Sequence, residues 1–300
     1  MKLVNNTLAT LLPLIPKVFV KRFAMRYVAG ETVEEALSVV NRLNEVGYAV
    51  TLDILGEHTK SHDSAYQVRD AYFDLYNAIH NRGADCNISL KLTHLGLGFD
   101  DDLAENNFSQ LLNKAISLNN FLRIDMENSP YTDRTINLYN KYRDETDCIG
   151  LVIQSYLLRS ADDIDNLSGN RFNVRICKGI YREPEEIAYQ APEEIRQNFI
   201  SLAQKVIESG GYVGIATHDL FIIDTLETWI LNKKISGNRY EFQVLYGVPM
   251  AGRLEKLLDA GHKVRIYVPV GEEWYPYSIR RLQENPHLAG YIIKNFFRKK

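Results

Sequence analysis

Short apolar runs alternate with longer segments of helical periodicity along most of this chain. The runs are rich in β-branched residues and lie between polar or glycine-containing stretches, a pattern typical of strands. Eight runs are predicted as strands: Ala49–Leu55, Asn87–Leu92, Phe121–Met126, Gly150–Gln154, Asn173–Lys178, Tyr212–Ala216, Phe242–Tyr246 and Lys263–Tyr267. Their starts run from residue 49 to residue 263, which spaces them about 31 residues apart, enough for a strand, a helix and two loops.

The segments between the runs predict helices. Thr32–Gly47 is predicted as a helix because Thr32 and Glu35 have capping-box spacing and Gly47 can end the helix. Three further helices end just before a glycine: Ala65–Asn81, Glu193–Ser209 and Leu254–Leu258. This alternation favours an α/β fold of the (β/α)8, TIM-like barrel type, with an open doubly wound sheet as the alternative. We predict an N-terminal helical segment over residues 1–48 and a barrel over residues 49–300.

Composition narrows the class of protein. The chain is 45% hydrophobic and 24% charged, so it can bury a full core and remain in solution. A formal net charge of -3 argues against a dedicated nucleic-acid-binding protein. No apolar run approaches the roughly 20 residues of a membrane helix. Three cysteines without a CxxC pair fit a reduced, cytoplasmic chain: Cys86, Cys148 and Cys177.

Basic residues mark both ends of the chain. Lys17–Arg26 is a basic amphipathic stretch that we predict to be helical. Lys294–Lys300 interleaves aromatic and basic residues. This second segment is either a solvated tail or a surface that touches an anionic membrane, which leaves a peripheral position on the inner face of the membrane open.

Polar residues gather at the carboxyl ends of the predicted strands, where barrels carry their chemistry. In strand order they are Asp53 and Glu57, Lys91, Asp125 and Glu127, Gln154, Arg175 and Lys178, Thr217 with His218 and Asp219, Gln243 and Tyr246, and Arg265 and Tyr267. Buried ionisable groups cost several kcal/mol unless they are paired. We therefore interpret the set as one shared polar pocket rather than as charges that happen to flank strands.

The most distinctive local segment holds two adjacent arginines. Pro276 can open a helix there and Pro286 can close it. One face of that helix is predicted to carry Tyr277, Arg280, Arg281 and Glu284. Two adjacent guanidiniums can clamp a carboxylate or a phosphate. Glu57 is a candidate carboxylate to hold the pair in place.

Other motifs are weak or absent. His58 and His62 have the spacing of metal ligands on a helix, but the Glu of HExxH is missing, so no metal is predicted. No GxGxxG opens a helix and no P-loop is present, so a dinucleotide would bind outside a Rossmann crossover. The residues alone leave three readings open: a flavoenzyme, a Schiff-base aldolase that uses Lys91 or Lys178, and a non-catalytic barrel that binds an amino acid or anion.

Taken in order, nine motifs resemble the proline dehydrogenase family in its monofunctional bacterial form, from about Thr32 onward. They are Asp53-x-Leu-Gly-Glu57, Ser89-Leu-Lys-Leu-Thr93, Ile124-Asp-Met-Glu127, Gln154-Ser-Tyr156, Val174-Arg-Ile-Cys-Lys-Gly179, Ala216-Thr-His-Asp219, Glu241-Phe-Gln-x-Leu-Tyr-Gly247, Val264-Arg-Ile-Tyr-Val-Pro-x-Gly271 and Tyr277-x-x-Arg-Arg-Leu-x-Glu284. Each motif is common alone, and their order and spacing together are specific.

This resemblance implies an activity and its partners. The donor would be L-proline, the cofactor FAD and the product 1-pyrroline-5-carboxylate, formed by hydride transfer to flavin N5. A membrane quinone would accept the electrons, and a separate pyrroline-5-carboxylate dehydrogenase would use the product in the degradation of proline to glutamate.

The resemblance also implies roles for individual residues. Asp125 and Arg175 match catalytic positions, and Asp125 is expected to orient Lys91 or an arginine rather than to act as a free base. Substrate contacts are implied for Lys91, Tyr267, Tyr277, Arg280, Arg281, Leu245 and Glu57, with Glu57 and Arg280 pairing over the site. FAD contacts are implied for Met126, Gln154, Arg175, Lys178, Gly179, Ile180, Thr217 and His218.

Overall fold

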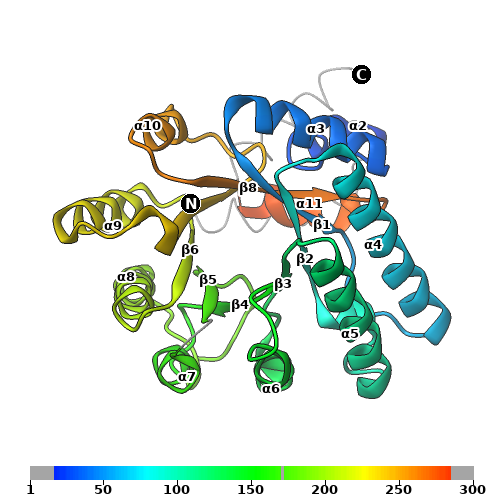
Figure 1. Ribbon diagram of the computed structural model, residues 1–300, viewed down its shortest axis with the longest axis horizontal. Helices are drawn as coiled ribbons and strands as arrows, with labels where there is room; N and C mark the ends of the chain where they lie inside the picture. Colours follow the sequence, from blue (N-terminus) through cyan, green and yellow to red (C-terminus); the bar gives the residue numbers. More distant parts are fainter. Residues whose placement is uncertain (1–16, 170–171, 285–300) are drawn as a thin grey trace.

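Eight parallel strands close into a barrel in which each strand pairs with the next along the chain and the last pairs with the first (Figure 1). The computed structural model describes residues 17–169 and 172–284. Figure 1 shows the strands at the centre with helices around them. The predicted (β/α)8 barrel is therefore confirmed, and the alternative of an open sheet is wrong.

Strands and helices alternate around the ring. The strands are β1 (Ala49–Ile54), β2 (Cys86–Leu90), β3 (Leu122–Ile124), β4 (Ile149–Gln154), β5 (Asn173–Cys177), β6 (Tyr212–Ala216), β7 (Tyr240–Leu245) and β8 (Val264–Val270). The α-helices are α2 (Lys17–Ala24), α3 (Val33–Val46), α4 (His62–Arg82), α5 (Asp101–Ser117), α6 (Thr132–Tyr142), α7 (Ser160–Leu167), α8 (Pro192–Glu208), α9 (Leu220–Lys233), α10 (Arg253–Asp259) and α11 (Trp274–Glu284). Short 3-10 turns are η2 (Leu92–Leu95), η3 (Ser129–Tyr131) and η4 (Gly237–Arg239).

Helix α3 begins and ends as predicted. The Thr32 side chain accepts a hydrogen bond from the Glu35 backbone, and the Glu35 side chain accepts one from the Thr32 backbone. Gly47 follows the helix in the left-handed conformation, with φ of 102°. Helix α3 packs on β1 and β8, so the segment before the barrel contributes a helix to the outer ring.

Strand β8 is longer than the run predicted for it, because Pro269 does not end it. Beyond Tyr267 the strand pairs with β1 alone, since its ladder with β7 stops at Leu245. The Val270 carbonyl accepts a hydrogen bond from Leu55, just after β1. Backbone groups of successive strand residues point to opposite sides, so those of Pro269 point to the side on which no strand pairs with β8. A proline is tolerated there because no backbone donor is needed. The Pro269 carbonyl instead accepts a hydrogen bond from Ala29.

Helix α11 lies against α2 and brings the C-terminal motif to the barrel (Figure 1). A separate apolar cluster joins the two helices and the loop after β1: Val20, Ala24, Val28, Leu55, Trp274 and Tyr277. The helix begins at Trp274, two residues before Pro276, and Pro286 lies outside the described residues. The predicted helix at Lys17–Arg26 is observed as α2, and the basic segment Lys294–Lys300 lies outside the described residues.

Apolar side chains fill the space between the strands and the helix ring in one large cluster. Among the helices that the structure describes, none combines the length and hydropathy needed to span a bilayer. The barrel interior itself is polar, and it leads into the site.

Candidate active site

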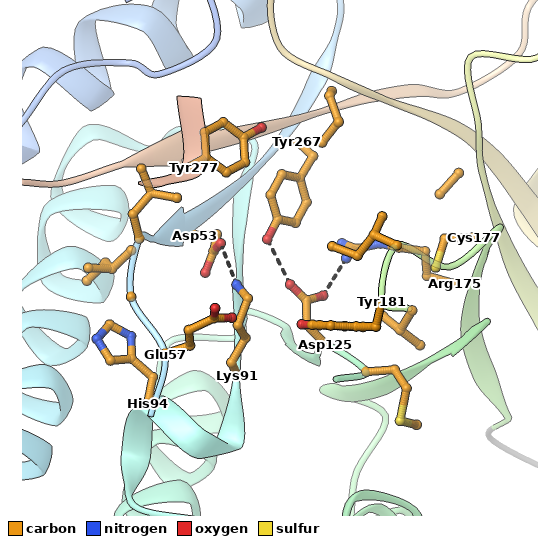
Figure 2. Close-up of a pocket in the computed structure, with 18 of the residues that line it drawn as sticks. Asp53, Glu57, Lys91, His94, Asp125, Arg175, Cys177, Tyr181, Tyr267 and Tyr277 are labelled. Carbon is orange, nitrogen blue, oxygen red and sulfur yellow. Dashed lines mark hydrogen bonds and ion pairs between the residues drawn. The ribbon is translucent and has the colours of Figure 1, made fainter. Parts of the chain in front are cut away.

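A deep cavity opens at the carboxyl ends of the strands (Figure 2). Its volume is about 1230 Å³, which exceeds the roughly 300–1,000 Å³ typical of a small-molecule pocket. Residues that lie within or just after each of the eight strands line the cavity. The cavity therefore has room for a dinucleotide together with a small second molecule.

Asp125 is the centre of a buried polar cluster on the floor of the cavity (Figure 2). It follows β3 and accepts two hydrogen bonds of 2.6 Å at Oδ1, from Arg175 Nη1 and from the Ser89 hydroxyl. The Tyr267 hydroxyl donates to Asp125 Oδ2 at 2.7 Å. The guanidinium carbon of Arg175 also lies 5.1 Å from the centre of the Tyr267 ring. Four strands thus hold one carboxylate and one guanidinium in fixed positions.

Lys91 and Asp53 form the second buried ion pair of the cavity. Lys91 Nζ donates to Asp53 Oδ2 at 3.0 Å, and the Asp53 side chain is only 2% exposed. Burial lowers the pKa of Lys91, but the attraction of the Asp53 and Asp125 carboxylates outweighs burial and raises the pKa above its ordinary value. Lys91 is therefore a protonated ammonium at physiological pH, suited to bind an anion.

A third charged group lies at the β5 and β6 side of the cavity. Lys178 Nζ and Arg196 Nε both donate to Asp219 Oδ2, at 2.6 and 3.0 Å. The Leu245 backbone N–H donates to His218 Nε2 at 2.9 Å. His218 is then a neutral imidazole with its proton on Nδ1, because Nε2 acts as the acceptor. This side of the cavity offers several donors to a phosphate-bearing ligand.

Gln154 places a buried acceptor, without a hydrogen-bond partner in the described part of the chain, at the wall of the cavity. The side chain is 2% exposed, and its Nε2 donates to the Met126 carbonyl at 3.3 Å. Its Oε1 is buried and has no hydrogen-bond partner among the described residues. A buried acceptor without a partner costs about 1–3 kcal/mol. A ligand with an N–H or O–H group at this point would remove that cost.

The structure brings the predicted site residues together. All of those whose side chains it describes line the one cavity: Glu57, Lys91, Asp125, Met126, Gln154, Arg175, Lys178, Gly179, Ile180, Thr217, His218, Leu245, Tyr267 and Tyr277. Arg280 and Arg281 belong to α11, and their side chains lie outside the described residues. The pairing of Glu57 with Arg280 therefore stays a prediction. Asp125 forms an ion pair with Arg175, and its expected role of orienting an arginine rather than acting as a free base stays a prediction.

Several cavity residues were not predicted as part of the site. They are His94, Tyr181 and Arg196. Asp53 and Gln243 also line the cavity, as expected of the shared polar pocket, but no individual role was predicted for them. The signal for Asp53 and Gln243 was the presence of a polar residue in the carboxyl-terminal half of a predicted strand. His94 and Arg196 lie on η2 and α8, and nothing in the periodicity of those segments places them at the cavity.

The two histidines with metal-ligand spacing do not share a site. His62 Nε2 lies 3.0 Å from Asp100 Oδ2, on the surface. His58 instead lies near Glu57 and Glu127, with possible ligand atoms within 4.8 Å of one another. Both oxygens of Glu127 already accept hydrogen bonds from Thr93, and these bonds explain the position of the Glu127 carboxylate.

The fold and the cavity define a (β/α)8 enzyme with a large pocket lined by cations and paired carboxylates. The sequence profile of the proline dehydrogenase family matches residues 36–292. The chain is 35% identical over 276 residues to Proline dehydrogenase 1 of Bacillus subtilis subsp. natto, covering 92% of this chain and 91% of that protein. It is also 35% identical over 281 residues to Proline dehydrogenase of Deinococcus radiodurans, covering 92% and 90%. The chain therefore belongs to the proline dehydrogenase family of oxidoreductases.

A solved structure supports the same fold. Proline utilization A from Bdellovibrio bacteriovorus, inactivated by N-propargylglycine, matches this chain with a TM-score of 0.81. The match covers 87% of this chain and 32% of that chain at 24% identity. At this identity the likeness shows the barrel and not the chemistry.

Proposed function

We propose that this chain oxidises L-proline to 1-pyrroline-5-carboxylate, with FAD as cofactor and a membrane quinone as final electron acceptor. One observation carries the proposal: a chain of this family gathers every described residue that the resemblance implies around one cavity. The product would pass to a separate pyrroline-5-carboxylate dehydrogenase, as the next step toward glutamate. We place the reaction in the cytoplasm, at the inner face of the membrane that holds the quinone.

The residues present fit FAD. The Oε1 atom of Gln154 is a buried acceptor that can receive an N–H of the ring system. Lys178, Thr217 and His218 offer donors for the ribityl chain and the pyrophosphate. Bound FAD would supply the hydride acceptor of the reaction. Arg175 is the guanidinium nearest to Asp125, and it would stabilise negative charge on the adjacent ring.

The side chains also prepare the substrate. Proline must lose a proton from nitrogen before a hydride can leave the adjacent carbon, because an ammonium has no lone pair. Lys91 and Arg175 would lower the pKa of a nearby ammonium by like-charge repulsion, and their partner carboxylates Asp53 and Asp125 would offset part of that effect. With Arg280 and Arg281 as the carboxylate clamp, the substrate ring would be held in one orientation against the apolar wall of Leu245 and Tyr277. Tyr267 would limit substituents on the ring.

The ion pairs argue against the Schiff-base alternative. A Schiff-base lysine must be a neutral amine to attack a carbonyl. Lys91 has a raised pKa and donates directly to Asp53. Lys178 is bound to Asp219 at 2.6 Å. Both lysine amines are thus hydrogen-bonded to a carboxylate rather than free to attack a carbonyl.

The decisive experiment is anaerobic. Purified protein should show the yellow spectrum of bound flavin, and L-proline should bleach it while D-proline should not. Protein that neither carries nor takes up FAD, or whose flavin spectrum ignores L-proline, would refute the proposal. We also expect N-propargylglycine to inactivate the enzyme in a time-dependent reaction that L-proline slows.

The carboxylate clamp has its own test. Arg280→Met and Arg281→Met should keep FAD and raise the KM for L-proline by at least tenfold, because each removes a charge-assisted hydrogen bond worth about 1.5–3 kcal/mol. Steady-state kinetics at fixed quinone concentration measures the effect. A wild-type KM in both variants would show that the substrate carboxylate binds elsewhere. Small cyclic carboxylates that lack the reactive C–N bond should compete with L-proline in the wild type.

A further inference from the structure

A line of three buried side chains runs beneath the cavity, from β7 to β5. Glu241 and Gln243 lie two residues apart on β7, and each is 2% exposed. The Gln243 Nε2 atom donates to Glu241 Oε1 at 2.6 Å. The Arg175 Nε atom donates to Gln243 Oε1, also at 2.6 Å. The amide of Gln243 therefore connects a carboxylate deep in the barrel to the arginine on the cavity floor.

The charges at the two ends of this line determine how the amide is oriented. Burial raises the pKa of Glu241, but Arg265 and Lys263 outweigh burial and lower that pKa to about 2. Glu241 is thus ionised at physiological pH and can only accept hydrogen bonds, whereas a guanidinium can only donate them. Gln243 must turn its NH2 group to Glu241 and its oxygen to Arg175. With the amide reversed, two donors would face each other at Arg175.

The neighbouring strand leaves space for this amide. Gly214 on β6 lies beside β7, and a Cβ atom at Gly214 would be 2.5 Å from Gln243 Nε2. Any side chain at this position would displace the amide. The absence of a side chain at Gly214 is therefore part of the arrangement that keeps Gln243 on Arg175.

Hydrogen bonds at two different nitrogen atoms therefore hold the Arg175 guanidinium. Gln243 holds Nε, and Asp125 holds Nη1 at 2.6 Å. Arginine side chains carry about 2 kcal/mol of rotamer entropy, so a guanidinium held at one atom alone would occupy several positions. A catalytic group needs to be held within about 0.5 Å of its working geometry by surrounding hydrogen bonds.

We propose that Gln243 and Glu241 are positioning residues of the oxidation, which fix the Arg175 guanidinium beside the cofactor ring. The inference rests on the proposed function, in which Arg175 stabilises negative charge on that ring. Neither residue needs to touch the substrate. Loss of either should therefore lower kcat and leave the KM for L-proline nearly unchanged, because Lys91 and the arginines of α11 bind the carboxylate from other elements.

Two variants at the amide test the proposal without changing any charge. Gln243→Leu removes the acceptor, and Gly214→Ala pushes the amide away while all polar groups remain. The matched control is Gly150→Ala on β4, where the added methyl would press on the guanidinium of Arg123. Arg123 donates to the Leu151 carbonyl and to Asn173 and takes no part in the hydrogen bonds that join Glu241, Gln243, Arg175 and Asp125. The measurements are kcat and KM for L-proline, the melting temperature, and the reduction potential of bound FAD.

We expect Gln243→Leu and Gly214→Ala to lower kcat by about 10- to 100-fold, the range seen when the hydrogen-bond partners behind metal ligands are removed, with KM within about twofold of the wild type. The reduction potential of bound FAD should become more negative, because a loosened guanidinium stabilises the added charge less well. Gly150→Ala should keep kcat and the potential of the wild type. Folded Glu241→Gln protein should show the same negative shift in the reduction potential of bound FAD as Gln243→Leu.

Normal kcat and potential in both amide variants would overturn the proposal. The proposal would also be overturned if Gly214→Ala and Gly150→Ala lowered kcat by the same factor and the melting temperature by the same amount. That result would indicate general destabilisation of the barrel. Failure of the proposed function is visible separately and earlier, as wild-type protein whose flavin does not respond to L-proline.

Discussion

His94 should make the stability of this enzyme depend on pH in the weakly acidic range. Its side chain is 7% exposed, and the ring lies so close to Gly56 that a Cβ there would overlap it. Nδ1 has no hydrogen-bond partner among the described residues. Burial, helped by repulsion from the Lys91 ammonium, lowers the pKa of His94 to about 4. The folded protein therefore keeps this imidazole neutral where an unfolded chain would protonate it.

The sign and size of the effect follow from the two pKa values. Between pH 6.5 and pH 4 the unfolded chain binds a proton at His94 and the folded chain does not, so stability falls as the pH falls. The complete shift, from about 6.5 to about 4, corresponds to about 3 kcal/mol at about 1.4 kcal/mol per unit. Between pH 7 and pH 5 the loss should be about 2 kcal/mol.

Urea unfolding at pH 7 and pH 5 can isolate this contribution. Between pH 7 and pH 5, and at equal FAD content, the free energy of unfolding of His94→Leu should fall by about 2 kcal/mol less than that of the wild type, because the variant has no imidazole to protonate. His80→Leu is the matched control, since His80 is exposed in the last turn of α4 and its removal leaves His94 in place. An unchanged pH dependence in His94→Leu, or an equal change in the control, would refute the reasoning.

Three further predictions concern stability at neutral pH, measured by urea unfolding. Thr32→Ala should cost about 1 kcal/mol because it removes the cap of α3, and Thr32→Ser should restore most of it. Asp53→Asn should cost roughly 3–5 kcal/mol, because it leaves the buried Lys91 ammonium without its directly bonded carboxylate; a loss below 1 kcal/mol would contradict this. Gly247→Ala should cost more than about 1 kcal/mol, since φ is 76° and the new Cβ would overlap the Arg26 carbonyl; unchanged stability would show that the loop relaxes.

Local rules explain how much of the fold could be predicted. The strands are buried along most of their length, so most of their residues are apolar, and the capping box of Thr32 and Glu35 marks a helix start directly. The run predicted as Lys263–Tyr267 stopped short of the observed end of β8 at Val270. Whether Pro269 is tolerated depends on which neighbour the strand still has at that point, and this is a property of the closed barrel rather than of the local sequence.

The site was predictable to the extent that it follows strand ends. Parallel strands bring their carboxyl ends to one rim, so Lys91, Asp125 and Lys178 had to lie near one another once the barrel closed. The partner of each charge was not predictable. Asp125 binds Arg175 from β5, whereas Lys91 binds Asp53 from β1, and spacing along the chain does not distinguish these pairs.

The polar interior explains why such pairs could form only in the folded barrel. An ionised side chain inside a strand is costly by itself, by several kcal/mol, and becomes acceptable when an opposite charge arrives from another strand. Arg175 is stabilised by Asp125 from one side and by Gln243 from the other, across 50 and 68 positions of sequence. Gly214 adds to this arrangement only by lacking a side chain, which leaves no signal in a hydrophobicity pattern. The features that hold the Arg175 guanidinium most tightly are therefore those that a hydrophobicity pattern reveals least, and the Gly214→Ala variant examines one of them directly.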